Sequence, residues 1–405
     1  MRSNPMPDRS VLAAPIAPLR KILQDIRASY WFIPACLSVL AVLLAWGTWV
    51  LESDEWMPEM TLGRDAARNL VTTIAAAVIG VAGVMFSLTL VAVTHAAGKY
   101  GPRLIGNFMR DRGTQWALGI MVATFVHALT TLILIDGVSA ASLRLPVLCS
   151  VGLAFVSVGA MIFFIHHVPE TVNVSNIAAS LGQRLTRMVR AEIDEADARD
   201  ADASEIPDRA PDLQPEPPGA GYIQAIGVTK LREIADEHDL IIRVEASPGS
   251  FVTPHAPLLS VWGSADWDEI RSDIDATIAI GREPTETQTL TFLADQLVEM
   301  AGIALSPGVN DPFTAITCLN WLGAALTEAL EYEGGLDPKQ SGRVHLPQLT
   351  FETIYDHAFH AAIPYVRDDR MASEALIAHL RALSTRCDGR ARRTVLRDMR
   401  DLSSG

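Results

Sequence analysis

Four long apolar segments, with no Lys, Arg, Asp or Glu in their interiors, dominate the first 170 residues of the chain. They cover residues 31–51, 69–93, 116–135 and 145–165. Crossing the roughly 30 Å hydrocarbon core of a bilayer takes about 20 apolar residues. A lone backbone N–H or C=O group in lipid costs several kcal/mol, so such a segment crosses only as a helix. The sequence therefore predicts four transmembrane helices.

Basic residues alternate from one connection to the next along these four segments. Five precede the first segment, two follow it, four separate the second and third, one separates the third and fourth, and Arg184, Arg187 and Arg190 follow the last. Loops rich in Lys and Arg stay on the cytoplasmic side of a membrane. We therefore expect a multi-pass protein whose N- and C-termini are both cytoplasmic.

The rest of the chain changes in period and composition. Apolar residues recur every three or four positions at Val174, Ile177, Leu181 and Leu185, and an acidic Pro-rich stretch follows. The predicted parts are a cytoplasmic N-terminal segment 1–30, a four-helix transmembrane domain 31–167, a connecting helix 168–198, an acidic linker 199–220, a small β module 221–265 and a helical cytoplasmic domain 266–405. The expected fold is an α-helical membrane protein with a C-terminal cytoplasmic α+β region.

The β module is predicted from alternation and turn residues. Residues 240–246 alternate and are β-branched, residues 247–250 supply a turn, and short strands follow at 251–252 and 258–262. The run 247–259 resembles one half of a small biotinyl/lipoyl-type β-barrel. Since no lysine stands on a tight turn to carry a prosthetic group, we expect only a barrel-like structural or oligomerising module.

The composition of the chain argues against several classes of function. The formal net charge is −14, whereas nucleic-acid binding needs a basic face. The four cysteines form no CxxC pair, so neither a zinc site nor a disulfide framework is predicted. The sequence also lacks a glycine-rich phosphate loop and a nucleophile elbow. We therefore predict no enzyme, no catalytic residue and no cofactor.

The second apolar segment carries a row of small, weakly polar residues at spacings of three and four. Its members are Thr73, Ala76, Gly80, Gly83, Ser87 and Thr94, with Leu90 the only large residue in the row. Small residues let helix backbones approach closely in lipid, which favours packing within one chain. The alternative is that copies of this helix surround a pore in an oligomer, because such positions obstruct a path little.

His127 lies near the middle of the third apolar segment. An ionisable residue at that depth is a functional candidate, either as a proton relay or as a contact for a permeating ion. A neutral imidazole hydrogen-bonded to a neighbouring Thr or carbonyl is an equally good interpretation.

The turn at residues 306–314 joins two apolar helices and contains the polar residues Ser306, Asn310, Asp311 and Thr314. Gly308 suits the end of the first helix, and Asp311 can cap the second with Pro312 in its first turn. The pattern favours a tight helix–helix corner. Polar groups beside a helix N-terminus also suit an anion or small ligand.

His357 and His360 are three residues apart and share a helix face, the spacing of two metal ligands. No third ligand is evident nearby, so we predict no metal site and expect a surface or subunit-contact pair.

Several runs of the chain resemble a bacterial family of predicted membrane proteins, domain of unknown function 2254. The runs are FSLTLVAV at 86–93, YGPRLIGNFMRD at 100–111, HHVPE at 166–170, GYIQ at 221–224 and LVEMAGIALSPGVNDPFTA at 297–315. The resemblance covers residues 22–366 and implies a bacterial inner-membrane location, but it implies no activity. One departure is Thr289, where the family leads us to expect an acidic residue. This departure weakens a ligand role for the turn at residues 286–289.

These observations lead to one preferred function and one alternative. We predict a homo-oligomeric ion channel or channel-like transport protein in the lipid bilayer, with the second apolar segment and residues 103–112 as its gate region. Ions or a small ligand are its expected partners. The alternative is a membrane-anchored sensor or scaffold that binds a ligand or partner at residues 306–314 of its cytoplasmic domain.

Overall fold

A computed structural model of the chain describes residues 30–51, 63–101, 111–137, 144–197, 204–217, 219–264, 266–284, 290–330, 340–347 and 350–404. Nearly all of the predicted N-terminal segment, residues 103–110 of the predicted gate region, the start of the acidic linker and Thr289 lie outside these ranges. The described residues are mostly helical, as the sequence predicts. They form two compact units, which we call the N-terminal unit (1–98 and 102–173) and the C-terminal unit (99–101 and 174–405).

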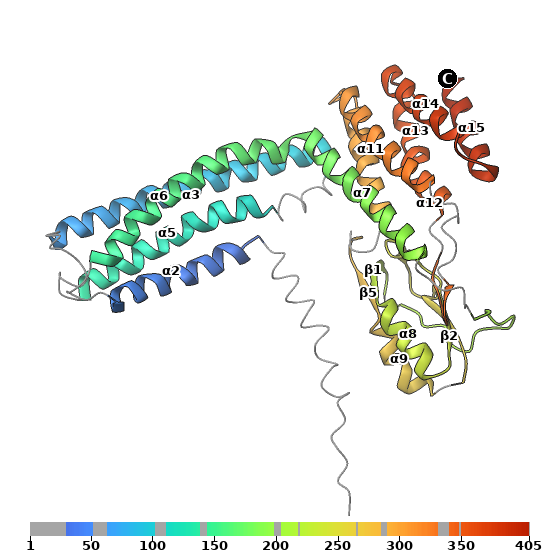
Figure 1. Cartoon of the computed structure of the whole chain (residues 1–405), viewed down its shortest axis with the longest axis horizontal. Coiled ribbons are helices and arrows are strands. Elements are labelled where there is room, and N and C mark those ends of the chain that lie inside the picture. The colour runs from blue at the N-terminus through green and yellow to red at the C-terminus, as the bar shows by residue number, and fades with distance from the viewer. Residues whose placement is uncertain are drawn as a thin grey trace, which may run out of the picture. The chain divides into compact units, whose positions relative to one another are not determined.

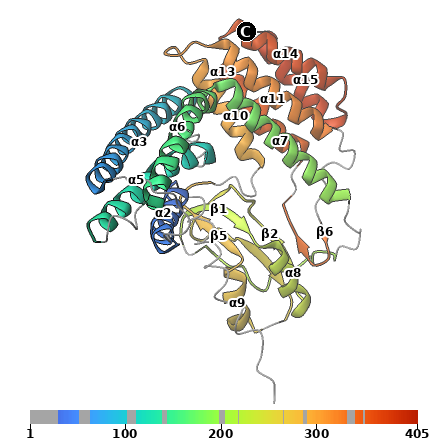
Figure 2. The same cartoon turned by 60° about the vertical axis from the view of Figure 1, so that its left-hand side comes forward.

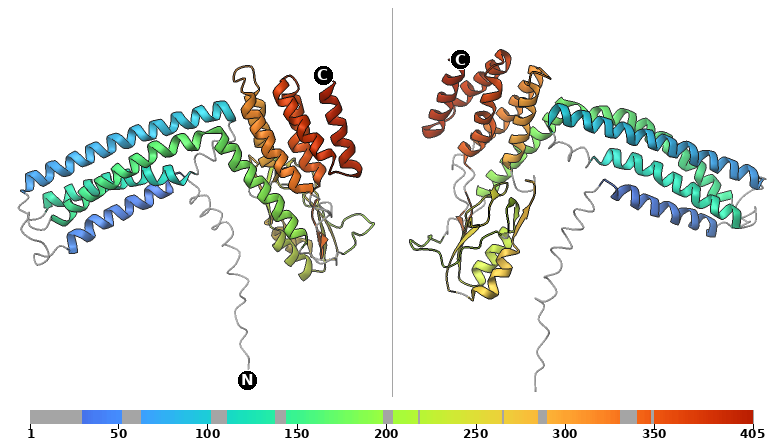
Figure 3. Two further views of the ribbon diagram at one scale, coloured as in Figure 1. Left: turned by 45° about the horizontal axis from the view of Figure 1, so that its top comes forward. Right: turned by 180° about the vertical axis from the view of Figure 1, so that it is seen from behind.

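The N-terminal unit contains the four apolar helices that the sequence predicts. They are α2 (Phe32–Leu51), α3 (Arg64–Tyr100), α5 (Arg112–Gly137) and α6 (Arg144–Val172), which lie side by side in Figures 1 and 3. α5 packs against both α2 and α6. Small and medium apolar side chains of α3, among them Ala82 and Met85, meet Met121 of α5 and Phe164 of α6. Burial in this unit is therefore shared among helices that are each apolar.

α3 is longer than its apolar core. It has 37 residues, a length of about 55 Å at 1.5 Å per residue. The predicted segment 69–93 is shorter because hydropathy marks only the lipid-compatible part of a helix. The extra turns carry Arg64, Arg68 and Lys99, so the polar ends of α3 are suited to water or lipid headgroups.

Five helices among the described residues are long and apolar enough to cross a membrane. Four belong to the N-terminal unit, and the fifth is α11 (Pro312–Leu330) of the C-terminal unit. The sequence places a helix there but assigns it to the cytoplasmic domain. Length and apolarity alone do not distinguish a spanning helix from a buried one.

The helical part of the C-terminal unit is built around a hairpin of α10 (Leu290–Ala304) and α11. α7 (Val174–Asp197) packs on both of these helices. The remaining helical elements are α12 (Phe351–Tyr355), the π-helical turn η4 (Asp356–His360), α13 (Ala361–Val366), α14 (Arg370–Ser384) and α15 (Gly389–Ser403). Figure 2 shows α7, α10 and α11 grouped with α13, α14 and α15.

The strands of the C-terminal unit form two small open sheets, and the barrel-like prediction is wrong for the residues that the structure describes. One sheet has the order β3 (Phe251–Val252), β1 (Gly221–Ile226), β5 (Ile278–Gly281). The other has the order β4 (Leu259–Trp262), β2 (Ile241–Val244), β7 (Val344–His345), β6 (Gln340–Ser341). The predicted module 221–265 cannot close on itself here, because β5, β6 and β7 of these sheets lie beyond its end.

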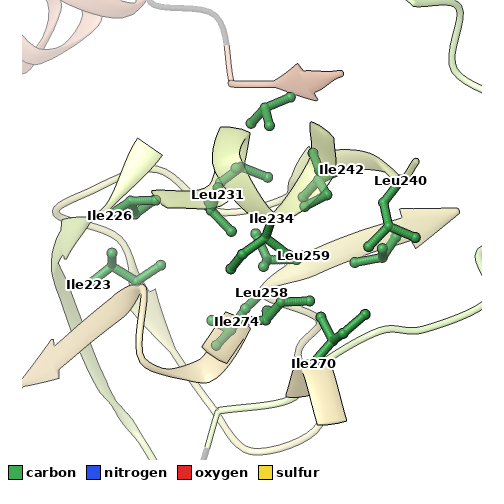
Figure 4. Packing of buried hydrophobic residues seen from close by; sticks show 14 of the residues in the cluster. Ile223, Ile226, Leu231, Ile234, Leu240, Ile242, Leu258, Leu259, Ile270 and Ile274 are labelled. Atoms are coloured by element: carbon green, nitrogen blue, oxygen red, sulfur yellow. The ribbon is translucent and has the colours of Figure 1, made fainter. Parts of the chain in front are cut away.

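One apolar core joins these sheets to two helices. α8 (Val228–Glu237) contributes Leu231 and Ile234, and α9 (Trp267–Asp275) contributes Ile270 and Ile274. Figure 4 shows these side chains converging with others from both sheets. Part of the predicted linker is ordered against this body, because Leu213 forms a bridge with Val261 of β4.

A short piece of chain next to the N-terminal unit belongs to the C-terminal unit. Residues 99–101 are grouped with it, and Gly101 has a positive φ of 112°. A Cβ at Gly101 would stand 2.7 Å from the carboxylate oxygen Oε1 of Glu299 in α10. The positive φ favours glycine at this position.

The contact of α7 with α11 gives a test of this packing. A Cβ at Gly182 would lie 2.5 Å from Cβ of Trp321, a side-chain atom that cannot move without shifting the helix. We expect Gly182→Ala to lower the free energy of unfolding by about 1–3 kcal/mol through overpacking. Thermal unfolding of the purified chain measures the change. Gly308→Ala is the control, because nothing stands within 4 Å of its added Cβ; equal melting temperatures for the two variants would contradict this packing.

Candidate functional site

The row of small residues on α3 faces outward from its own unit. All six members, from Thr73 to Thr94, are exposed, whereas Val71, Ala75 and Val78 are buried on the opposite side. A Cβ at Gly80 or Gly83 would meet no atom within 4 Å. Packing among the described residues of the N-terminal unit therefore does not account for this face.

The hydroxyl groups of this face are bonded to their own helix. Thr73 Oγ1 donates to the carbonyl of Asn69 at 2.7 Å, Ser87 Oγ to Gly83 at 3.0 Å, and Thr94 Oγ1 to Leu90 at 2.7 Å. Each hydroxyl oxygen keeps acceptor capacity. The face combines small volume with weak polarity, which suits close contact with another helix or with a polar path.

His127 belongs to a second polar surface, which is buried between α5 and α6. Its Nδ1 lies 3.1 Å from Ser150 Oγ of α6. One turn away, Thr124 Oγ1 of α5 lies 2.8 Å from Ser157 Oγ of α6. The sequence indicates His127 alone, but polar residues at spacings of three and seven in two apolar helices are a signal that could have revealed its partners.

The polar groups of the turn at 306–314 serve the turn itself. Asp311 caps α11, because its Oδ1 accepts from Thr314 N at 3.1 Å and its Oδ2 from Thr314 Oγ1 at 2.6 Å. These bonds hold the pKa of Asp311 below its ordinary value. Ser306 Oγ donates to the carbonyl of Ile303 at 2.6 Å, and Asn310 takes a positive φ of 50°. The predicted helix–helix corner accounts for this chemistry, and the ligand role stays a prediction.

His357 and His360 make separate contacts. His357 Nδ1 lies 2.8 Å from Asp295 Oδ1 of α10, and His360 Nδ1 lies 2.9 Å from Asp398 Oδ2 of α15. No group of three or more His, Cys, Asp or Glu side chains in the described part of the chain is arranged to hold a metal ion. The two histidines instead attach the π-helical turn to two different helices.

Asp398 of α15 is a buried carboxylate that accepts several hydrogen bonds, and it was not singled out in the sequence analysis. It is 1% exposed and accepts hydrogen bonds from Tyr355 Oη at 2.9 Å and from Arg397 Nε at 3.2 Å. The pKa of Tyr355 is raised mainly because the side chain is buried, and the nearby Asp398 carboxylate raises it further. Tyr355 and His360 are 43 and 38 residues from Asp398 along the chain, so no local motif indicates these two partners.

The structure thus defines a class of protein, in which an apolar helical bundle is joined to a separate α+β unit. The sequence matches the family of predicted membrane proteins called domain of unknown function 2254 (DUF2254) over residues 27–382, and the chain belongs to this family. Uncharacterized proteins of Mycobacterium bovis and Mycobacterium tuberculosis are 28% identical over 414 residues, covering 96% of this chain and 78% of each relative. No solved structure matches the chain significantly.

The contact of His357 with Asp295 predicts a pH dependence. The carboxylate raises the pKa of His357, so the contact stabilises the fold below the unfolded pKa of about 6.5 and this contribution disappears as pH rises through the folded value. Both side chains are more than one-third exposed, so we expect Asp295→Asn to cost less than about 1 kcal/mol at low pH. Melting temperatures measured below a pH of about 6.5 and above the folded pKa of His357 test this, with Glu374→Gln as control. A destabilisation by Asp295→Asn that does not shrink at the higher pH would refute it.

Proposed function

We propose that the chain is a homo-oligomeric channel or channel-like transport protein, in which the outward face of α3 meets the same face of other copies. The observation that carries the proposal is that all six members of the small-residue row are exposed among the described residues, with open space at Gly80 and Gly83. Small residues are the means by which helices approach closely in lipid, where no hydrophobic force drives association.

The flanks of α3 support the same arrangement. Val84, Phe86 and Leu88 are 52–60% exposed and large, as side chains that face lipid tails can be. Between such flanks, a strip of glycine and hydroxyl residues gives a narrow surface that differs from lipid-facing surface. Four helices per copy are few for enclosing a path, so a path between copies follows naturally, and hydroxyl oxygens are suitable lining groups.

In this proposal α2, α3, α5 and α6 span the bacterial inner membrane, and α11 does not. α11 packs through its buried face on three helices of the C-terminal unit, α7, α10 and α14. Asn320 of α11 contacts His379 at 2.9 Å, and Glu328 is ion-paired with Arg190 of α7. The apolar character of α11 therefore serves the core of the C-terminal unit, and both termini are cytoplasmic by the distribution of basic residues.

Reporter fusions test this topology. A green fluorescent protein at the C-terminus should be fluorescent, because it folds in the cytoplasm, and alkaline phosphatase at the same position should be inactive. Alkaline phosphatase inserted between α2 and α3 should be active. An active phosphatase at the C-terminus would mean that α11 also crosses the membrane and would overturn the four-helix arrangement.

Crosslinking in native membranes tests the assembly. In a chain with Cys36 and Cys149 changed to Ala, we expect Gly83→Cys to give a crosslinked dimer, because the α3 faces approach closely. Leu88→Cys is the matched control, since Leu88 is 52% exposed on the other flank of α3. Equal crosslinking at the two positions, or none at Gly83→Cys, would contradict the proposed interface.

Current across a planar bilayer tests the transport role separately. Wild-type protein should give discrete currents that Gly83→Trp abolishes and Leu88→Trp keeps, because only the first side chain would enter the path. Currents that survive in Gly83→Trp would exclude α3 from the path. If wild-type protein gives no current while Gly83→Cys still crosslinks, the assembly stands and the transport role fails.

A further inference from the structure

The polar surface between α5 and α6 contains a pair of side-chain atoms that the proposed α3 path does not use. Thr124, His127 and Thr131 follow one face of α5, and all three are 0% exposed. His127 lies about 4 Å along the helix axis from the midpoint of α5, at 1.5 Å per residue. A polar surface at this depth in an apolar bundle is costly unless its groups are hydrogen-bonded.

The hydrogen bonds of Ser150 favour one tautomer of His127. Ser150 Oγ donates its single proton to the carbonyl of Pro146 at 3.0 Å. With this proton on the Pro146 carbonyl, the serine oxygen accepts in its 3.1 Å contact with His127 Nδ1, and Nδ1 carries the proton. In a neutral imidazole the other nitrogen then has no proton. In this arrangement Nε2 of His127 is a hydrogen-bond acceptor.

His127 Nε2 is buried and has no hydrogen-bond partner among the described residues, and the same holds for Thr131 Oγ1. The hydroxyl of Thr131 differs in its hydrogen bonding from those of two other threonines of α5. Thr124 and Thr130 donate to the carbonyls of Ile120 and Val126, four residues earlier, each at 2.8 Å. The hydroxyl of Thr131 is not used in this way, and it lies one turn from His127 on the same face of α5.

The chemistry of these two atoms restricts what can bind at this face of α5. One imidazole nitrogen and one hydroxyl are too few ligands for a divalent metal ion, which takes four or more. An anion needs N–H donors, and Nδ1–H already serves Ser150. The complementary ligand is a small neutral molecule that donates to Nε2 and exchanges a hydrogen bond with the hydroxyl. A bound donor removes the cost of leaving these buried groups without a hydrogen bond.

We propose that His127 Nε2 and Thr131 Oγ1 form an intramembrane binding site for a water molecule. This site is separate from the α3 face, so it does not depend on the proposed channel function. It places a water molecule near mid-depth of the apolar bundle, beside an imidazole acceptor.

Magic-angle-spinning NMR of the full chain in lipid bilayers tests the site. The chain has ten histidines, so 15N-histidine spectra of wild type and His127→Phe identify the His127 signals by difference. We expect the Nδ1–H tautomer, with Nε2 unprotonated and accepting a hydrogen bond. A His127 that carries its proton on Nε2 would overturn the proposal.

Polarisation transfer from water to the His127 ring gives the second measurement. Wild type should show transfer, and Thr131→Val should lose it, because the valine keeps the shape of threonine without its hydroxyl. Thr130→Val is the matched control and should keep the transfer, since Thr130 bonds to its own helix. An unchanged His127 Nδ1 signal shows that each variant is folded. Equal transfer in both variants, or none in wild type, would refute the water site.

Discussion

Hydrogen bonding of the backbone inside each apolar helix is the constraint on which the N-terminal unit depends. With those bonds made internally, α2, α3, α5 and α6 can exist in lipid before they meet one another. How these helices pack is a separate question. Lipid tails are as apolar as the helix side chains, so apolar contacts between helices gain little over contacts with lipid. Small residues and the few polar ones then carry the specificity. The outward glycines of α3 and the hydroxyls that meet across α5 and α6 are two uses of the same limited set of residue types.

The four apolar helices could be predicted from the sequence because hydropathy over about 20 residues is a strong local signal. Their polar extensions could not, and α3 is longer than its segment at both ends. The β-barrel-like module failed for a different reason. β1 pairs with β5, and β2 pairs with β7 from a region about 100 residues later, so the local pattern identified strands without identifying their partners.

For the candidate sites too, the sequence predicts local features and does not identify distant partners. Periodicity shows that Thr73 and Gly80 share a face of α3, but not which neighbour that face meets. Only the bundle shows that the face is open. Local chemistry was sufficient for Asp311, which caps the helix that follows it. It was insufficient for His357 and His360, whose carboxylate partners are supplied by α10 and α15.

The position of Gly101 has a consequence for the order in which the chain is made. Residues 99–101 leave the ribosome long before α10, yet they belong to the C-terminal unit and lie against Glu299 of that helix. The C-terminal unit is therefore discontinuous in sequence, and the two apolar helices α5 and α6 are synthesised between its pieces. A fragment that begins at α7 lacks one of those pieces, so cutting the gene after α6 does not yield the whole unit. The C-terminal unit is complete only after α5 and α6, which lie between its two pieces in the sequence, have been translated.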